Sequence, residues 1–433
     1  MVRRRHVIYV QGYDPRGLAE YYRMFRGEYR KFLALYGFKG DIARVDGAPD
    51  RNASLWSVHT QGRDWQVDTT YEFLRWEDII RRDFERPMGW AIVAALHALL
   101  GAVFQGGLFR VLRAHWRFGL FVLYPYMLLL GWFVSAGLVG TAVAALGAHF
   151  GIPAPLPALL GIGTAIAAFL AAIRLTEPTT YMLYLFQDAA STAQYARRER
   201  ADWEERLETF AGYVIEAAQT GAADEIVVVG HSSGSFLAVD VLTRALARDP
   251  DLGRHGPRVV LLTIGANLPI VGFHRGAQWF RDLIARLAFE PSIDWVDYQS
   301  RRDVMNFFPF NPVTGHRIEV GNRPLSLKVV PVQFRDVVSP ERFAWLRWHF
   351  FSLHFQFLRA NEKPNDYDYF MIVAGPFSLP QRVAMPRAVT DAVAGDETAA
   401  RAAWQRIAGH PQAPAALAPA RGCDTSTPTA GAP

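Results

Sequence analysis

The sequence is poor in cysteine, and a long central stretch has no charged residue. Its 433 residues include one cysteine, Cys423, so no disulfide bond can form within the chain. It contains no G-x-x-x-x-G-K-[ST] loop, no His/Cys spacing typical of a metal site and no Lys/Arg run interleaved with aromatic residues. We therefore expect no phosphate-binding loop of this type, no metal, no cofactor and no nucleic-acid partner.

Residues 118–173 contain no Asp, Glu, Lys or Arg. A helix needs about 20 residues to cross the hydrocarbon core of a bilayer, so this stretch is long enough for two crossings and a tight connection. Uncharged helix breakers, among them Gly151, Pro153 and Pro155, mark the connection. The sequence therefore predicts a transmembrane helical hairpin with spans at about 118–147 and 156–173, and with the bilayer as a partner.

A third apolar stretch, residues 88–109, is also long enough to span a bilayer. If the apolar segments 6–11 and 225–229 are strands of one sheet, the chain must cross the membrane an even number of times between them. The hairpin already supplies two crossings. We therefore expect residues 88–109 to lie along the membrane interface or to cover the mouth of an active site. A full third span is the alternative.

The charges that flank the hairpin predict its orientation. Arg110, Arg113 and Arg117 precede the first span and Arg174 follows the second, whereas the connecting turn has no Lys or Arg. The positive-inside rule places both flanks in the cytoplasm. We expect an integral membrane protein with two spans and a cytoplasmic domain, in the inner membrane if the protein is bacterial.

Strand-like and helix-like segments alternate outside the apolar stretch. The expected strands are 6–11, 68–76, 225–229, 258–264, 293–298 and 325–334, a helix is expected at 339–360, and residues 40–62 are expected to be irregular. Such alternation is typical of an α/β fold with a mostly parallel sheet and helices on both faces. The expected division is 1–86 and 176–384 for the two parts of this domain, 87–175 for the membrane insertion, and 385–433 for an Ala/Pro-rich, mostly disordered tail.

The segment Gly230-His231-Ser232-Ser233-Gly234 lies between the apolar run 225–229 and a helix-like segment. A strand, a sharp turn with Ser at the centre of G-x-S-x-G, and a helix form a nucleophile elbow. The turn pushes the serine hydroxyl out of the backbone, and side chains two residues to either side would collide, which favours Gly230 and Gly234. The pattern predicts Ser232 as a nucleophile. The alternative is a glycine-rich turn with an unreactive serine.

A serine hydroxyl needs a base to remove its proton, and the base needs an acid to orient it. Asp303 follows the strand segment 293–298, and open α/β sheets carry their chemistry beyond the carboxyl ends of their strands. Asp294 and Asp297 lie within the same segment. We therefore prefer Asp303 as the acid.

Candidate bases follow the last expected strand. His349 and His354 are five residues apart, so on one helix they point in different directions and only one is expected to serve. His354 is preferred because it follows Ser352, a residue that can interrupt a helix locally. His316, which precedes the strand, is the third candidate.

An oxyanion hole requires two backbone N–H donors. We expect one from Ser233, the residue after the nucleophile. The other is expected from Tyr13 or Gly12, in the loop that follows the first strand, where a glycine allows close approach of the backbone.

The strand with its loop, HVIYVQGYDP, the GHSSG elbow and the downstream Asp and His together resemble the α/β-hydrolase superfamily, in its lipase/esterase-like branch. The resemblance covers residues 6–85 and 180–375, with the membrane hairpin inserted before the elbow strand. It implies Ser232, Asp303 and His354 as a catalytic triad. This chain differs from the family at Gln11-Gly12, where many members carry His-Gly. The resemblance implies no particular substrate.

The expected function is that of a membrane-anchored serine hydrolase that cleaves an ester or thioester through an acyl-enzyme. A lipid-derived acyl substrate would suit the apolar segment 88–109. One alternative is an acyltransferase with the same triad. The other is a non-catalytic membrane scaffold with a hydrolase fold, in which His354 would not be within hydrogen-bond reach of Ser232.

Overall fold

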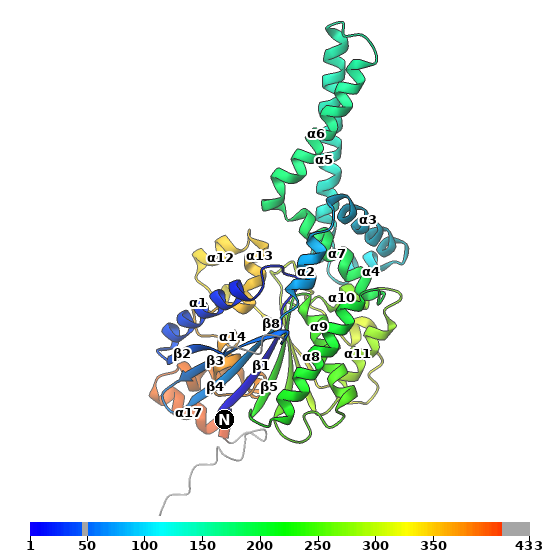
Figure 1. The fold of residues 1–433 in the computed structure, drawn as a ribbon. Helices are drawn as coiled ribbons and strands as arrows, with labels where there is room; N and C mark the ends of the chain where they lie inside the picture. Colours follow the sequence, from blue (N-terminus) through cyan, green and yellow to red (C-terminus); the bar gives the residue numbers. More distant parts are fainter. Residues whose placement is uncertain (46–50, 409–433) are drawn as a thin grey trace, which may run out of the picture.

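The computed structural model describes residues 1–45 and 51–408, and its centre is one eight-stranded sheet (Figure 1). The strand order is β2-β3-β4-β1-β5-β6-β7-β8. The strands are β1 (Arg4–Val10), β2 (Lys39–Val45), β3 (Ala53–Gln61), β4 (Gln66–Leu74), β5 (Glu225–His231), β6 (Arg258–Ile264), β7 (Ile293–Ser300) and β8 (Leu327–Val332). Pairing is parallel from β4 to β8 and antiparallel between β2, β3 and β4, so the sheet is mixed.

The antiparallel part corrects the expectation that residues 40–62 are irregular, because most of β2 and all of β3 lie in this range. Trp56, Val58 and Thr60 of β3 are buried, whereas Ser57 and Gln61 are exposed. A strand near the edge of the sheet needs few apolar residues, and only Trp56 and Val58 carry the alternation toward the core. Two apolar residues among polar neighbours are too few to indicate a strand from the sequence.

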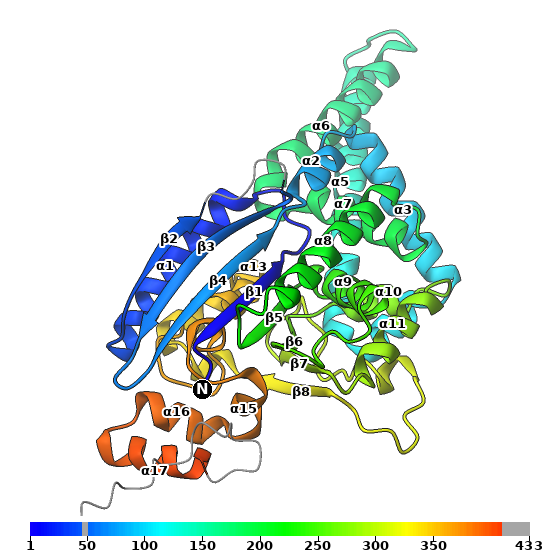
Figure 2. The same ribbon diagram turned by 60° about the horizontal axis from the view of Figure 1, so that its bottom comes forward.

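Alternate residues of the central strands pack on opposite faces of the sheet, which explains their continuous apolar runs. In β5, Ile226 and Val228 belong to one core, and Val227 and Val229 belong to the other. The first core is covered by α2 (Glu77–Phe84), α7 (Met182–Ala196), α8 (Ala201–Gln219), α9 (Gly234–Arg248), α10 (Leu268–Gly272) and α11 (Gln278–Ala288). Figures 1 and 2 show α8, α9 and α11 on this face.

The opposite face is covered by α1 (Leu18–Tyr36), α12 (Pro340–Leu346), α13 (Phe350–His354), α14 (Tyr369–Ala374) and α15 (Leu379–Ala384). Short 3₁₀ helices lie at Thr314–His316, Phe334–Asp336 and Phe355–Leu358. The helix expected at 339–360 is therefore interrupted. α12 ends at Leu346, α13 begins at Phe350, and His349 between them lies outside helical geometry with a φ of −117° and a ψ of 76°.

Two long helices, α5 (Trp116–His149) and α6 (Leu156–Thr180), project together away from the sheet (Figure 1). Both are long and apolar enough to cross a membrane, and they include the two expected spans. Large side chains such as Leu130, Phe133 and Leu138 are exposed on α5, which an aqueous surface would disfavour. Within the described residues, α2 and α3 (Met88–Phe104) would add a third span only if this pair, bent by 105°, were a single one.

The sheet itself decides between two and three crossings. β1, which precedes α3, pairs directly with β5, which follows α6. Both ends of the insertion therefore lie on the same side of any membrane, and the number of complete crossings between them is even. With α5 and α6 as spans, α3 and the following α4 (Gly107–Ala114) do not form a third.

Part of the tail at 385–433, which was expected to be mostly disordered, is helical. Residues 386–408 contain α16 (Pro386–Ala394) and α17 (Glu397–Ala408), which pack around Phe377, Val389 and Ile407. An Ala-rich composition favours helix when a few apolar residues find a partner surface. The rest of the expected disordered tail, 409–433, lies outside the described residues.

Candidate active site

The turn between β5 and α9 has the geometry that the G-x-S-x-G pattern predicts. Ser232 has a φ of 57°, in the left-handed region that residues other than glycine seldom adopt. Its N–H donates to the carbonyl of Ile264, 3.2 Å away, and its own carbonyl accepts from the N–H of Ser235 at 2.9 Å. The neighbouring strand and the first turn of α9 thus hold Ser232 in this conformation.

Both flanking glycines are required by close contacts. A Cβ atom on Gly230 would lie 2.6 Å from the carbonyl oxygen of Gly234 and from the Cα of Ser235. A Cβ atom on Gly234 would collide with the backbone oxygens of Val10 and Gln11 at the end of β1. The glycines therefore allow α9 to start directly against the loop that follows β1.

Asp303 and His354 meet although 50 residues separate them along the chain. Nδ1 of His354 lies 2.6 Å from Oδ2 of Asp303, and both side chains are buried. The other oxygen of Asp303 accepts from the N–H of Met305 at 2.9 Å, and Asn306 donates to the Asp303 carbonyl at 2.7 Å. A carboxylate held in this way fixes the imidazole with the proton on Nδ1 and leaves Nε2 as the basic nitrogen.

Nε2 of His354 has no hydrogen-bond partner among the described residues. His354 and Ser232 line the same cavity, but no hydrogen bond joins Ser232 Oγ to His354 Nε2 in residues 1–45 and 51–408. Catalytic hydrogen bonds of this type are often long without substrate and shorten in the substrate complex. The structure thus places Ser232 and His354 at one cavity and pairs His354 with the buried Asp303 behind it.

The other candidate acids are engaged elsewhere. Asp294 pairs with Arg258 at the surface, with 3.0 Å between the charged groups. Asp297 is buried within the sheet and accepts from Thr263 at 2.8 Å and from Gln299 at 2.6 Å. Burial raises the pKa of Asp297 to about 6. Neither carboxylate pairs with a histidine.

The other candidate bases are also remote from Asp303. The ring of His349 stacks on Trp345 with 3.9 Å between the ring centroids, and its Nδ1 is 2.8 Å from the Trp345 carbonyl oxygen. Nδ1 of His316 is 2.6 Å from the carbonyl oxygen of Pro312. Burial lowers the pKa of His316 to about 4. His231, next to the nucleophile, packs on His354, and burial lowers its pKa as well, so this ring stays neutral.

The predicted oxyanion donors surround Ser232. A Cβ atom on Gly12 would lie 3.0 Å from the Cβ and 3.5 Å from the Oγ of Ser232, so a larger residue would crowd the nucleophile. Within the described parts of the chain, no acceptor is found for the backbone N–H groups of Gly12, Tyr13 and Ser233. These donors are available to a developing negative charge.

Tyr13 is anchored by a buried polar network that the sequence did not suggest. Its hydroxyl donates to Asp83 at 2.9 Å, and its carbonyl accepts from the hydroxyl of Tyr184 at 2.5 Å. Asp83 also binds Arg200 and the hydroxyl of Ser191, at 2.9 and 3.0 Å. The network fixes the loop after β1 to α2 and α7, the helices next to the membrane insertion.

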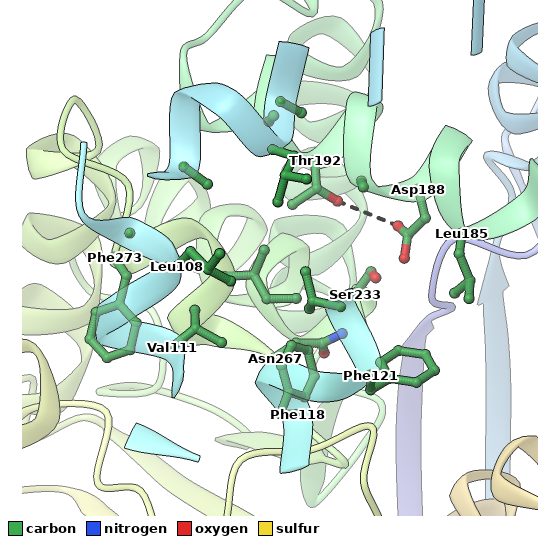
Figure 3. A pocket seen from close by; sticks show the side chains of 18 of the residues that line it. Leu108, Val111, Phe118, Phe121, Leu185, Asp188, Thr192, Ser233, Asn267 and Phe273 are labelled. Carbon is green, nitrogen blue, oxygen red and sulfur yellow. Dashed lines mark hydrogen bonds between the residues drawn. The ribbon is translucent and has the colours of Figure 1, made fainter. Parts of the chain in front are cut away.

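A mostly apolar cavity is lined in part by Ser232 and Ser233. Figure 3 shows its lining from close by. Its walls come from α3, α4, the start of α5, and α7, with Leu99, Leu108, Val111, Phe118 and Phe121 among the apolar side chains. Part of the segment 88–109, from Ala98 to Leu108, lines this cavity. Helices contiguous with the membrane hairpin thus form a chamber beside the elbow.

Three polar side chains, Asp188, Ser233 and Asn267, project into this apolar cavity (Figure 3). Thr192 donates to Asp188 at 3.4 Å. Burial raises the pKa of Asp188 to about 7, although the hydroxyls of Thr192 and Ser233 oppose the shift. Sequence reasoning missed Asp188, because a single Asp on an amphipathic helix gives no sign of the surface that it faces.

Within the described residues, no group of three or more His, Cys, Asp or Glu side chains is placed to hold a metal ion. The site brings together the side chains of Ser232, His354 and Asp303 and the backbone N–H groups around Ser232. Comparisons of the chain with family models, with curated proteins and with solved structures give no match.

Proposed function

We propose that the protein is a membrane-anchored serine hydrolase that cleaves an ester or thioester of an apolar acyl group. The observation that carries the proposal is the buried Asp303–His354 pair, whose free Nε2 lines one cavity with Ser232 on its strained turn. The elbow, the order Ser-Asp-His and the helices on both faces of the sheet favour an α/β-hydrolase-like fold for this function.

The proposed reaction has two steps. Nε2 of His354 accepts the proton of Ser232 Oγ as the oxygen attacks the acyl carbonyl, and the backbone N–H groups of Ser233 and of Gly12 or Tyr13 stabilise the oxyanion. The bond from the acyl carbon to the leaving oxygen or sulfur then breaks, and His354 gives its proton to the leaving atom. Water, activated by the same nitrogen, hydrolyses the acyl-enzyme and regenerates Ser232.

The apolar cavity supports an acyl substrate. It adjoins Ser232 and Ser233, and nearly half of its lining residues belong to the insertion that carries the two candidate spans. An acyl chain in a bilayer could enter it with little exposure to water, and each CH₂ group buried there contributes about 0.8 kcal/mol. We place the catalytic domain in the cytoplasm, on the evidence of the arginines that flank the hairpin.

Labelling by a fluorophosphonate probe tests the nucleophile. The full chain in detergent should be labelled, and Ser232→Ala should lose the label and lower the hydrolysis rate at least about a thousandfold. Ser57→Ala, an exposed serine on β3, is the matched control and should label as wild type does. Undiminished labelling of Ser232→Ala would refute the assignment.

The same experiment tests the scaffold alternative. That alternative expects His354 to lack a hydrogen bond to Ser232, and no such bond is present among the described residues. A scaffold predicts no labelling of the wild-type chain. Labelling that depends on both Ser232 and His354 is incompatible with it. Product analysis with and without an alcohol acceptor then separates hydrolysis from acyl transfer.

A further inference from the structure

Ser232 lies at the boundary of two cavities with different linings. The apolar one is described above. The second, of about 350 Å³, is lined by residues that include Gly12, Arg16, His354 and Arg359. A substrate with its reacting carbonyl at Ser232 therefore has an apolar side and a side that carries two guanidinium groups.

The position of His354 decides which part of the substrate enters which cavity. In the proposed reaction, Nε2 of His354 must donate a proton to the leaving oxygen or sulfur, so the leaving group must lie beside this imidazole. His354 lines the second cavity and not the apolar one. The acyl chain therefore extends into the apolar cavity, and the leaving group extends toward Arg16 and Arg359.

The two arginines differ in their partners. Arg16 is neutralised by Asp14, to which its Nε and Nη2 donate at 3.0 and 2.6 Å. Arg359 is half-buried, and its guanidinium forms no hydrogen bond or ion pair with any described residue. Its acidic neighbour, Glu28, binds Lys31 at 2.8 Å and the N–H of Ala360 at 3.1 Å. Arg359 lines both this cavity and a neighbouring one that includes Glu28 and Arg342, and it is a cation whose donors have no partner among the described residues.

Burial lowers the pKa of Arg359, and the nearby charges of Arg16 and Arg342 act in the same direction, against Glu28. A guanidinium still remains protonated at neutral pH. A half-buried cation without a partner has lost part of its hydration, and a bound anion would offset that cost. Arginine presents donors in a planar fork that suits the oxygens of a phosphate group.

We propose that Arg359 binds a phosphate group carried by the leaving group of the substrate. The inference rests on the proposed function and specifies its substrate class: an acyl group esterified to a phosphate-bearing alcohol, or joined as a thioester to a phosphate-bearing thiol. The phosphate takes no part in bond breaking. The acyl bond to oxygen or sulfur breaks, the bond to Ser232 Oγ forms, and the proton passes from Ser232 through His354 to the leaving atom.

Two matched substrate pairs test this proposal with the full chain in detergent micelles. The ester pair is 1-acylglycerol-3-phosphate and 1-acylglycerol; the thioester pair is acyl-coenzyme A and the acyl thioester of N-acetylcysteamine. Within each pair only the phosphate-bearing part differs. In one of the pairs, wild type should cleave the phosphate member with a higher kcat/KM than the neutral member. That pair identifies the kind of molecule that carries the phosphate.

Arg359→Gln should lower kcat/KM for that phosphate member by about 10- to 100-fold, as expected for a lost charged hydrogen bond, and should change the neutral member less than about twofold. The loss should be in KM, because the phosphate is bound equally in the ground and transition states. Arg359→Lys should restore part of the affinity. Arg30→Gln, an exposed arginine of α1, is the control and should behave as wild type.

The inference would be overturned if Arg359→Gln affected both members of a pair equally, or affected neither. Fluorophosphonate labelling of Ser232 would in that case still support the proposed function. A wild-type chain that prefers the neutral members would overturn the inference in the same way. Failure to label Ser232 together with no cleavage of any of the four substrates would overturn both.

Discussion

Asp188 places a carboxyl group in the wall of a mostly apolar cavity, and this has a consequence for stability. Burial raises the pKa of Asp188 to about 7, whereas an unfolded chain has an Asp pKa of about 3.9. Between about pH 4 and pH 7 the folded protein retains a proton that the unfolded chain has lost. The free energy of unfolding therefore falls as the pH rises through this window and levels off above it.

We expect Asp188→Asn to flatten this pH dependence. An amide keeps a similar shape and carries no charge, so the variant should gain stability relative to wild type as the pH rises from 5 to 7.5, by up to a few kcal/mol. Urea unfolding in detergent at several pH values measures the difference. Asp282→Asn, on the exposed face of α11, is the control. Parallel stability curves for wild type and Asp188→Asn would contradict the expectation.

The residues of the site differ in how far the sequence could predict them. Gly230 and Gly234 are required by collisions within the turn and with the adjacent β1 loop, so the motif shows them directly. Asp303 and His354 were chosen by their positions after strands and by chain order, and the structure places their side chains 2.6 Å apart. The significance of Asp188 and Arg359 depends on which helices pack over them, and no local pattern carries that information.

At the scale of the elements, the two long helices meet at a pair of glycines. A Cβ atom on Gly161 would lie 2.5 Å from the carbonyl oxygen of Gly140 and 2.8 Å from the Cβ of Ala144, and a Cβ on Gly140 would likewise meet the backbone of Gly161. Small residues let helices approach closely, which favours their association in a membrane. Gly163, two residues further along α6, has nothing within 4 Å of such a Cβ atom.

Gly140→Leu should therefore separate α5 from α6, whereas Gly163→Leu should be tolerated. Overpacking of this kind costs about 1–3 kcal/mol, so the first variant should unfold at a lower temperature in detergent. Both variants add the same side chain to the same hairpin, and they differ only in the surface that it meets. Equal melting temperatures for the two would show that this contact does not hold the hairpin together.

Elements with long, uniform patterns agreed with expectation, and short or mixed ones did not. The spans expected at 118–147 and 156–173 lie inside α5 and α6, because an uninterrupted apolar run has one stable form in lipid. The helix α6 continues beyond Arg174 to Thr180. The arginine ends the apolar run, but a charged residue does not end a helix. In β2 and β3 the alternation is carried by two apolar residues only, and the break at His349 depends on packing rather than on a helix-breaking residue.

For the whole molecule, the sheet and the hairpin constrain each other. The direct pairing of β1 with β5 across the insertion requires an even number of crossings, and α5 and α6 supply two. The domain that contains the sheet and the turn between the spans must then lie on opposite sides of the membrane. The apolar cavity, walled by α3 and α4, lies where the chain enters and leaves the lipid. This arrangement suits a substrate that stays partly in the bilayer.

Cysteine accessibility tests the topology. In a Cys423→Ser background, Ala148→Cys near the turn should react with a membrane-impermeant maleimide in intact cells, because the turn is expected outside. Ser57→Cys on β3 should react only after permeabilisation, because the sheet is expected in the cytoplasm. The reverse pattern would invert the orientation and keep the two spans. Reaction of both cysteines from the same side would mean that the hairpin does not cross the membrane, and the acyl cavity would then have to receive its substrate from water.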